Sequence, residues 1–183
     1  KPDIISGATP MAQCAAGQLS EIQAPIDMFL GFMPGSVGET SVLAILLGAF
    51  ILVFTGIASL RIILSTIAGG LFIAWLFNLI GLNEYMQMPA YYHLIIGGFA
   101  FGTIFMATDP VTAAQTPFGK LVYGFLIGSF AIVLRVLNPA YPEGMMLAIL
   151  FMNIMAPLID HYVIEHHIKK RIRYAIKRKS SII

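Results

Sequence analysis

The chain has 183 residues, of which 58% are hydrophobic and only 11% are charged, and its mean hydropathy is +0.84. Soluble domains usually carry about 25% charged residues. This composition therefore excludes an ordinary soluble protein and indicates an integral membrane protein. The formal net charge is small, at +2, and the single cysteine, Cys14, excludes an intrachain disulfide and argues against a cysteine metal site.

Five apolar stretches approach the length of about 20 residues that a membrane-spanning helix needs. None of them shows the period-two alternation of a half-buried strand, so helices are predicted. Short polar breakers join them, which predicts antiparallel neighbours. The expected fold is an all-α integral membrane bundle with about five transmembrane helices. In chain order the predicted spans are Ser41–Leu60, Ile62–Leu82, Tyr91–Thr108, Leu121–Leu137 and Met145–Ile164.

The chain divides into three predicted regions: residues 1–40 as a loop with an interfacial or re-entrant segment, residues 41–164 as the bundle, and residues 165–183 as a basic tail. The re-entrant candidate is Ala24–Ser41, which is apolar but too short to span. A second break is expected at Thr108–Pro117. Irregular backbone at membrane depth is tolerated only where protein or a cavity shelters it, so two breaks point to a transport or cofactor site.

The basic residues predict the orientation, because seven of the eleven Lys and Arg lie between Lys169 and Lys179. The positive-inside rule puts this tail in the cytoplasm, and five spans then put the segment that contains Thr9 on the outer side. Isoleucines at every fourth position of the tail predict an amphipathic helix on the inner membrane surface rather than a nucleic-acid ligand. Arg135, near the outer end of the fourth span, is expected either to snorkel to the interface or to pair with an acid.

Three acids, Asp160, Asp109 and Glu39, are candidates for an ion path, because an ionisable group at membrane depth is costly. Each also has a structural alternative. Glu39 precedes a helix start, where a carboxylate complements the helix dipole. Asp109 and Pro110 have the form of an N-cap followed by proline. Asp160 lies late in its helix, so it is expected to handle an ion or to pair with His161 or a basic neighbour.

The four histidines do not follow a zinc-site spacing, so no metal site is predicted. The sequence contains neither a Walker motif nor a dinucleotide-binding fingerprint with the required strand and helix around it. A Ser-His-Asp triad is not specified by any spacing. Catalytic residues are therefore left unassigned.

One short polar stretch, DIISGAT, lies near the N-terminus. By composition it is a loop with a reactive hydroxyl. It resembles the flavinylation motif D-x-x-S-G-A-T of covalent flavoproteins in sodium pumps, whose last threonine takes FMN through a phosphodiester. The resemblance implies that Thr9 is the FMN attachment point, with Asp3, Ser6, Gly7 and Ala8 as the recognition context.

Four further stretches resemble the same family, in the right order along the chain. They are PGSVGETS at 34–41, FMATDPVTAAQT at 105–116, NPAYPEGMMLAIL at 138–150 and APLIDHYV at 156–163. The family comprises the B subunit of the sodium-translocating NADH:quinone reductase and the related D subunit of the Rnf complex. NPAYPEGMM and the tail stretch IKKRIRY favour the first branch.

The resemblance implies a multi-pass subunit of the bacterial inner membrane, with two five-helix repeats in a urea-transporter-like inverted arrangement. This chain corresponds to the C-terminal half. The implied function is a redox subunit, inactive alone, that carries covalent FMN and passes electrons toward riboflavin and quinone while Na⁺ is translocated. The implied partners are the N-terminal half, a flavin-bearing neighbour and other subunits, a flavin transferase and the lipid bilayer. The transferase works outside the cytoplasm, which agrees with the orientation predicted from charge.

Three alternatives remain open at this point. The first is the Rnf-type subunit, in a complex where ferredoxin supplies electrons and NAD accepts them. The second is a non-redox channel half of the urea or ammonium type, which would carry no covalent flavin. The third is a purely structural half-bundle.

Overall fold

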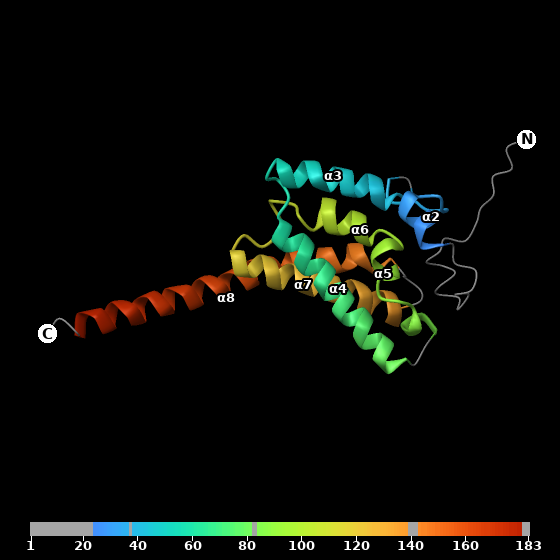
Figure 1. Cartoon of the computed structure of the whole chain (residues 1–183). Helices are drawn as coiled ribbons and strands as arrows, with labels where there is room; N and C mark the ends of the chain where they lie inside the picture. The colour runs from blue at the N-terminus through green and yellow to red at the C-terminus, as the bar shows by residue number, and fades with distance from the viewer. Residues whose placement is uncertain (1–23, 37, 82–83, 139–142, 181–183) are drawn as a thin grey trace, which may run out of the picture.

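The computed structural model describes residues 24–36, 38–81, 84–138 and 143–180, and within these ranges every regular element is a helix. This confirms the predicted all-α class. The elements are α2 (Pro25–Leu30), α3 (Val42–Phe54), α4 (Leu60–Ile80), the 3-10 turn η2 (Glu84–Gln87), α5 (Tyr92–Ile95), α6 (Phe99–Phe101), the π-helix η3 (Gly102–Met106), α7 (Pro117–Leu137) and α8 (Gly144–Ser180) (Figure 1).

Three of these helices, α4, α7 and α8, are long and apolar enough to cross a membrane, judged by length and composition. Helix α7 is the centre of the bundle, because it packs against α4 on one side and α8 on the other. Tyr123, Ile127 and Ile132 of α7 are completely buried between them. The tyrosine keeps its hydroxyl satisfied by donating to the Asn153 side chain on α8.

The contacts between these helices fix their relative directions. Gly124 of α7 faces Ser65 of α4, and Gly128 faces Gly70, so the two helices run parallel. Helix α8 runs the other way along α7, since Asn153 meets Tyr123 whereas Asp160 meets the residue before α7 begins. The chain must therefore cross the bundle once between α4 and α7, and the segment from α5 to η3 makes that crossing.

The crossing segment corrects the prediction of one continuous helix over Tyr91–Thr108. Helix α5 ends at Ile95, Ile96 is extended with ψ 135°, and Gly97 has φ +66°. Glycine alone adopts such a φ without steric cost, which explains why the chain breaks at this glycine pair. Helix α6 and the π-helix η3 then complete the crossing.

The first predicted span, Ser41–Leu60, is also shorter in the structure. Helix α3 covers 13 residues, about 20 Å, which is less than the hydrocarbon core of roughly 30 Å. It begins after Ser41, whose side chain accepts from a backbone amide of the first turn. It ends where the Thr55 hydroxyl donates to two carbonyls of the last turn, and Gly56 follows with φ +75°.

Helix α8 is longer than any predicted span. Its 37 residues extend over about 55 Å, so its C-terminal part runs past the other helices (Figure 1). The helix passes through residues 164 and 165 without a break, and the exposed Lys169 pairs with Glu165 at 2.7 Å. Ile164, Ile168 and Ile172 are exposed along this extension. The association of this extension with the inner membrane surface remains a prediction.

Helices α4 and α7 approach so closely that their contact depends on glycine. A Cβ on Gly128 would collide with the Thr66 carbonyl oxygen, and one on Gly69 would collide with the Phe125 carbonyl oxygen. Both obstacles are backbone atoms, so no side-chain rotation relieves the clash. Small residues at such crossings let membrane helices pack backbone to backbone, which is where van der Waals contact stabilises them most.

Replacement of Gly128 by valine should therefore force α4 and α7 apart. We expect a loss of stability of about 3 kcal/mol, at the upper end of the usual cost of overpacking. The thermal midpoint of the purified protein in detergent, followed by size-exclusion chromatography, measures the effect. Leu137→Val, at an exposed position on the same helix, is the matched control. Equal midpoints for the two variants would contradict the close crossing.

Candidate functional site

The proposed flavin-attachment residues Asp3, Ser6, Gly7, Ala8 and Thr9 lie outside the described residues. The remaining candidates are described, and they divide between two places. Asp109 and Asp160 lie at the loop between η3 and α7. Glu39 lies beside the break between α5 and α6.

Asp160 of α8 binds the start of α7. Its carboxylate accepts from the backbone amides of Gln115 at 2.6 Å and Thr116 at 3.0 Å, and also from the Thr116 hydroxyl. Thr116 is in turn the N-cap of α7, because its side-chain oxygen accepts from the Gly119 amide at 3.1 Å. The carboxylate thus lies at the positive end of the α7 dipole, where a negative charge is stabilising.

These hydrogen-bond partners differ from the ones expected for Asp160, although Lys120 of α7 is a basic neighbour of its carboxylate. The sequence predicted an ion or a pairing with His161 or a basic neighbour, whereas the carboxylate meets two backbone amides and a hydroxyl 44 or 45 residues away. Asp160 was expected late in its helix but lies near the middle of α8, and its charge is stabilised because the carboxylate faces the beginning of α7.

Asp109 organises the other end of the same loop. Its carboxylate accepts from the Thr112 hydroxyl at 2.7 Å and from the amides of Thr112 at 3.2 Å and Val111 at 3.4 Å. The bond from the Thr112 hydroxyl is the main cause that holds the pKa of the Asp109 carboxyl below its ordinary value. The carboxylate thus caps a single turn, in which the Ala113 amide donates to the Asp109 carbonyl at 3.1 Å, but no helix follows Pro110, because α7 begins only at Pro117.

The loop that joins η3 to α7, which both acids contact, is also held by hydrogen bonds within itself. The Gln115 side chain donates to the carbonyls of Pro110 and Ala113, each at 2.8 Å. Asp109 and Asp160 therefore hold opposite ends of one short loop. The structure brings these two candidates to the same end of the bundle, and both of their carboxylates are already hydrogen-bonded.

Glu39 belongs to a different environment. It lies three residues before α3, is half-buried, and reaches the break in the crossing segment, since a Cβ on Gly98 would lie 2.7 Å from its Oε2. Gly98 thus leaves room for this carboxylate. The sequence placed Glu39 only at a helix start, and the approach to Gly98 connects it to the break as well.

The break also has a cationic partner, which the sequence did not reveal. Arg135 of α7 is 1% exposed, and its guanidinium donates to the carbonyls of His93 at 2.7 Å and Ile96 at 3.2 Å. It also lies 6.0 Å from the centroid of the Phe99 ring. One carbonyl belongs to α5 and the other to the extended residue that follows it, where the helix no longer supplies donors. The expected snorkelling of Arg135 is therefore wrong: its charge is inside the bundle, where it satisfies the broken backbone.

In the part of the chain that the structure describes, no group of three or more His, Cys, Asp or Glu side chains lies close enough together to hold a metal ion. His161, His166 and His167 are exposed on α8, whereas His93 is buried in α5.

Comparison with known proteins identifies similar sequences over almost the whole chain. The family described as NQR2, RnfD, RnfE matches residues 1–169. The B subunit of the Na(+)-translocating NADH-quinone reductase of Chromohalobacter salexigens is 52% identical over 176 residues, which are 93% of this chain and 43% of that protein. The protein of the same name from Azotobacter vinelandii is 51% identical over 93% of this chain and 44% of its own length. The chain thus spans less than half the length of the curated relatives it matches.

The anchoring role of Asp160 is testable by its removal. Asp160→Ala leaves two amides and a hydroxyl without their charged acceptor, and each such bond contributes about 1.5–3 kcal/mol. We expect faster hydrogen exchange at the amides of Gln115, Thr116 and Gly119, with α4 unchanged. His161→Ala, the next and exposed position on α8, is the control. Unchanged exchange of the loop in Asp160→Ala would contradict the anchor.

Proposed function

Because this chain belongs to the NQR2, RnfD, RnfE family, we propose that it is the C-terminal part of a membrane redox subunit in a complex that transfers electrons from NADH to quinone. Two similar proteins are named as the B subunit of the Na(+)-translocating NADH-quinone reductase. Helices α4, α7 and α8 support a membrane location. The partners in this proposal are the N-terminal part of the subunit, other subunits of the complex and a flavin-bearing neighbour.

The observation that carries the proposal is the stretch from Asp3 to Thr9, which lies within the family match. The residue types fit a covalent FMN. The Thr9 hydroxyl supplies the oxygen of the phosphodiester, and the small residues Gly7 and Ala8 leave room for a flavin transferase. Bound FMN supplies the redox chemistry, and the protein positions it and sets its electrostatic surroundings. Riboflavin and quinone follow in the proposed electron path.

The proposed orientation has Thr9 on the outer side of the bacterial inner membrane and the C-terminus in the cytoplasm. It rests on the basic residues of the tail. Exposed basic residues of α8 lie beyond the apolar part of that helix, which supports the same direction.

Na⁺ translocation is proposed to involve Asp160, Asp109 and Glu39. The two aspartates give the proposal a structural form, because their oxygens accept from the loop that joins η3 to α7. A cation that binds these oxygens competes with the Gln115, Thr116 and Thr112 donors. Ion occupancy would then alter the loop and, through Thr116, the start of α7.

Covalent attachment is tested first. The protein, produced with an active flavin transferase and denatured in SDS, should give a fluorescent band that is lost in Thr9→Ala, because the phosphoester oxygen is then missing. Ser20→Ala, another hydroxyl of the same N-terminal region, serves as the control and should stay fluorescent. A dark band from the unmodified chain would contradict the redox proposal and favour a channel of the urea or ammonium type.

The ion path is tested by Asp160→Asn in the complete complex. The amide keeps the volume of the side chain but removes its charge, so we expect sodium-stimulated activity to weaken while FMN stays attached. Thr116→Val disturbs the same anchor without a change of charge, and it should lower activity equally at all sodium concentrations. An unchanged sodium dependence in Asp160→Asn would eliminate this acid from the path.

The Rnf-type subunit is a second candidate, because the matching family includes RnfD and RnfE. In that complex ferredoxin supplies the electrons and NAD accepts them. The genes that neighbour this one distinguish the two candidates, since the partner subunits differ. Both candidates share the proposed flavin at Thr9.

A further inference from the structure

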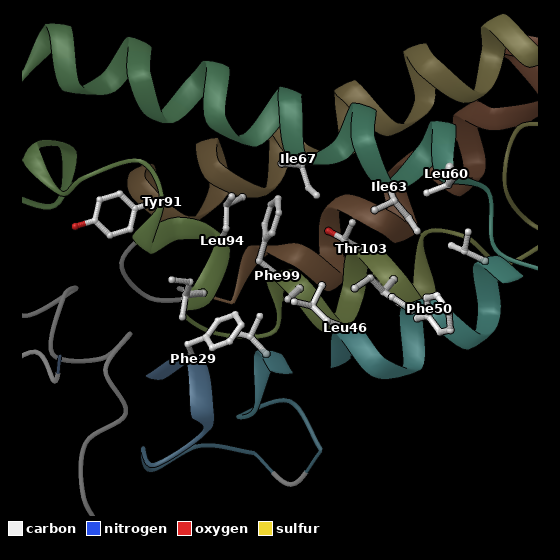
Figure 2. A pocket seen from close by; sticks show the side chains of 16 residues that line it. Phe29, Leu46, Phe50, Leu60, Ile63, Ile67, Tyr91, Leu94, Phe99 and Thr103 are labelled. Carbon is white, nitrogen blue, oxygen red and sulfur yellow. The ribbon is translucent and has the colours of Figure 1, made fainter. Parts of the chain in front are cut away.

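Exposed apolar side chains need a protein partner only where lipid does not cover them. Leu46 and Phe50 of α3 are exposed beside the hollow between α3, α4 and α6, as Figure 2 shows, and they belong to the bundle. Acyl chains are as apolar as leucine, so the bilayer can cover this surface. The exposed isoleucines of the C-terminal extension of α8 differ, because they lie past the end of the bundle: Ile164, Ile168 and Ile172.

The ends of the bundle locate the membrane boundary along α8. Helices α4 and α7 have 21 residues each, about 32 Å, which matches the hydrocarbon thickness of roughly 30 Å. Their first turns carry Arg61 and Lys120, and Asp160 of α8 binds the start of α7 at the same end. The hydrocarbon therefore ends close to Asp160. Ile168 and Ile172 follow at about 12 Å and 18 Å further along the helix axis, beyond the hydrocarbon.

The extension continues the direction of the spanning part of α8. The helix runs unbroken from Gly144 to Ser180, and after Pro157 it contains neither glycine nor proline. A segment that turns from a span onto the membrane surface needs a sharp kink, which such residues or an inserted π-turn usually supply. Figure 1 shows α8 running on past the ends of α4 and α7. The unbroken helix favours projection away from the membrane over contact along its surface.

Isoleucines and charges occupy different faces of the extension. The three isoleucines recur at every fourth position, so they form one row along the helix. At about 3.6 residues per turn, the exposed Lys169 and Arg171 fall on either side of this row. The one acid among residues 164–180, Glu165, pairs with Lys169 at 2.7 Å, so the excess charge of the extension is positive. An apolar row with charged edges is typical of a helix that docks into a groove.

We propose that the extension of α8 is a docking helix for a water-soluble protein surface that has an apolar groove with acidic edges. The isoleucines fill the groove, and Asp or Glu side chains at its edges pair with the cations, which fixes the orientation. A second copy of this chain does not fit, because two such helices would bring their cations together. Anionic lipid does not fit, because Ile172 lies about 18 Å beyond the boundary at Asp160. The proposal does not depend on the flavin or the Na⁺ proposals.

The test introduces the photoreactive residue p-benzoylphenylalanine in place of Ile168 in the complete protein, in its native membranes. Under light it should join to one other protein, within a peptide rich in Asp and Glu. The same probe in place of His166, which is exposed on the opposite face of the helix, is the matched control and should give at most about a tenth of this adduct. An adduct with phospholipid alone, or with a second copy of this chain, would overturn the proposal.

The acidic character of the partner is tested by charge. Arg171→Glu should lower the adduct formed at Ile168 about fivefold, because an exposed attraction is replaced by a repulsion, whereas Arg171→Lys keeps the charge and should leave the yield unchanged. A rise in salt from about 0.05 M to about 0.5 M should lower the yield without any further substitution, because salt screens exposed charges. A yield that responds neither to Arg171→Glu nor to salt would overturn the acidic groove.

Discussion

The satisfaction of broken backbone inside an apolar bundle is the constraint on which this structure depends. The crossing segment stops being helical at Ile96 and Gly97, and this leaves carbonyls inside the bundle without their helical donors. His93 and Ile96 are each 1% exposed, so other parts of the protein must supply the partners. Arg135 does so with two bonds, to His93 and Ile96, from a neighbouring helix. The break is thus sheltered by a charge whose burial would otherwise be unfavourable.

Helix α7 connects this break to the rest of the bundle through three different kinds of contact. Near its C-terminal end Arg135 binds the broken segment, in its middle Gly124 and Gly128 let α4 approach to backbone contact, and at its start Thr116 is held by Asp160 of α8. A displacement of α7 along its axis therefore disturbs the break and the loop together. This mechanical coupling makes the acids at the loop relevant to the whole crossing segment.

The positions and lengths of two long helices could be predicted from the apolar stretches of the sequence. The spans predicted at Ile62–Leu82 and Leu121–Leu137 correspond to α4 and α7 within a few residues, because long continuous hydrophobic runs specify helix length directly. The failures were at glycine. Two adjacent glycines fit equally well with close packing and with a chain break, and Gly69–Gly70 packs whereas Gly97–Gly98 breaks.

The candidate site was harder to predict, because its contacts join residues far apart in sequence. Asp160 meets Thr116 over 44 residues, and Arg135 meets His93 over 42. No local pattern encodes such pairs. The sequence pattern of a helix start, a capping residue followed by proline, also occurs twice, at Pro110 and at Pro117. The second begins the helix because 21 largely apolar residues follow it without a break, whereas only turns follow the first.

Three departures from regular α-helix lie close together in the crossing segment between α4 and α7. Positive φ at Gly97, the extended Ile96 and the π-helix η3 all fall within eleven residues. The π-turn has a consequence for side chains: Thr103 inside it lacks the carbonyl partner that Thr108, just beyond it, has. Broken helices at the centre of a bundle are where membrane proteins commonly build ligand and ion sites. In this chain the same irregularity leaves the buried Thr103 hydroxyl without a partner among the described residues and brings Glu39 toward Gly98, so both features arise from one departure from helical geometry.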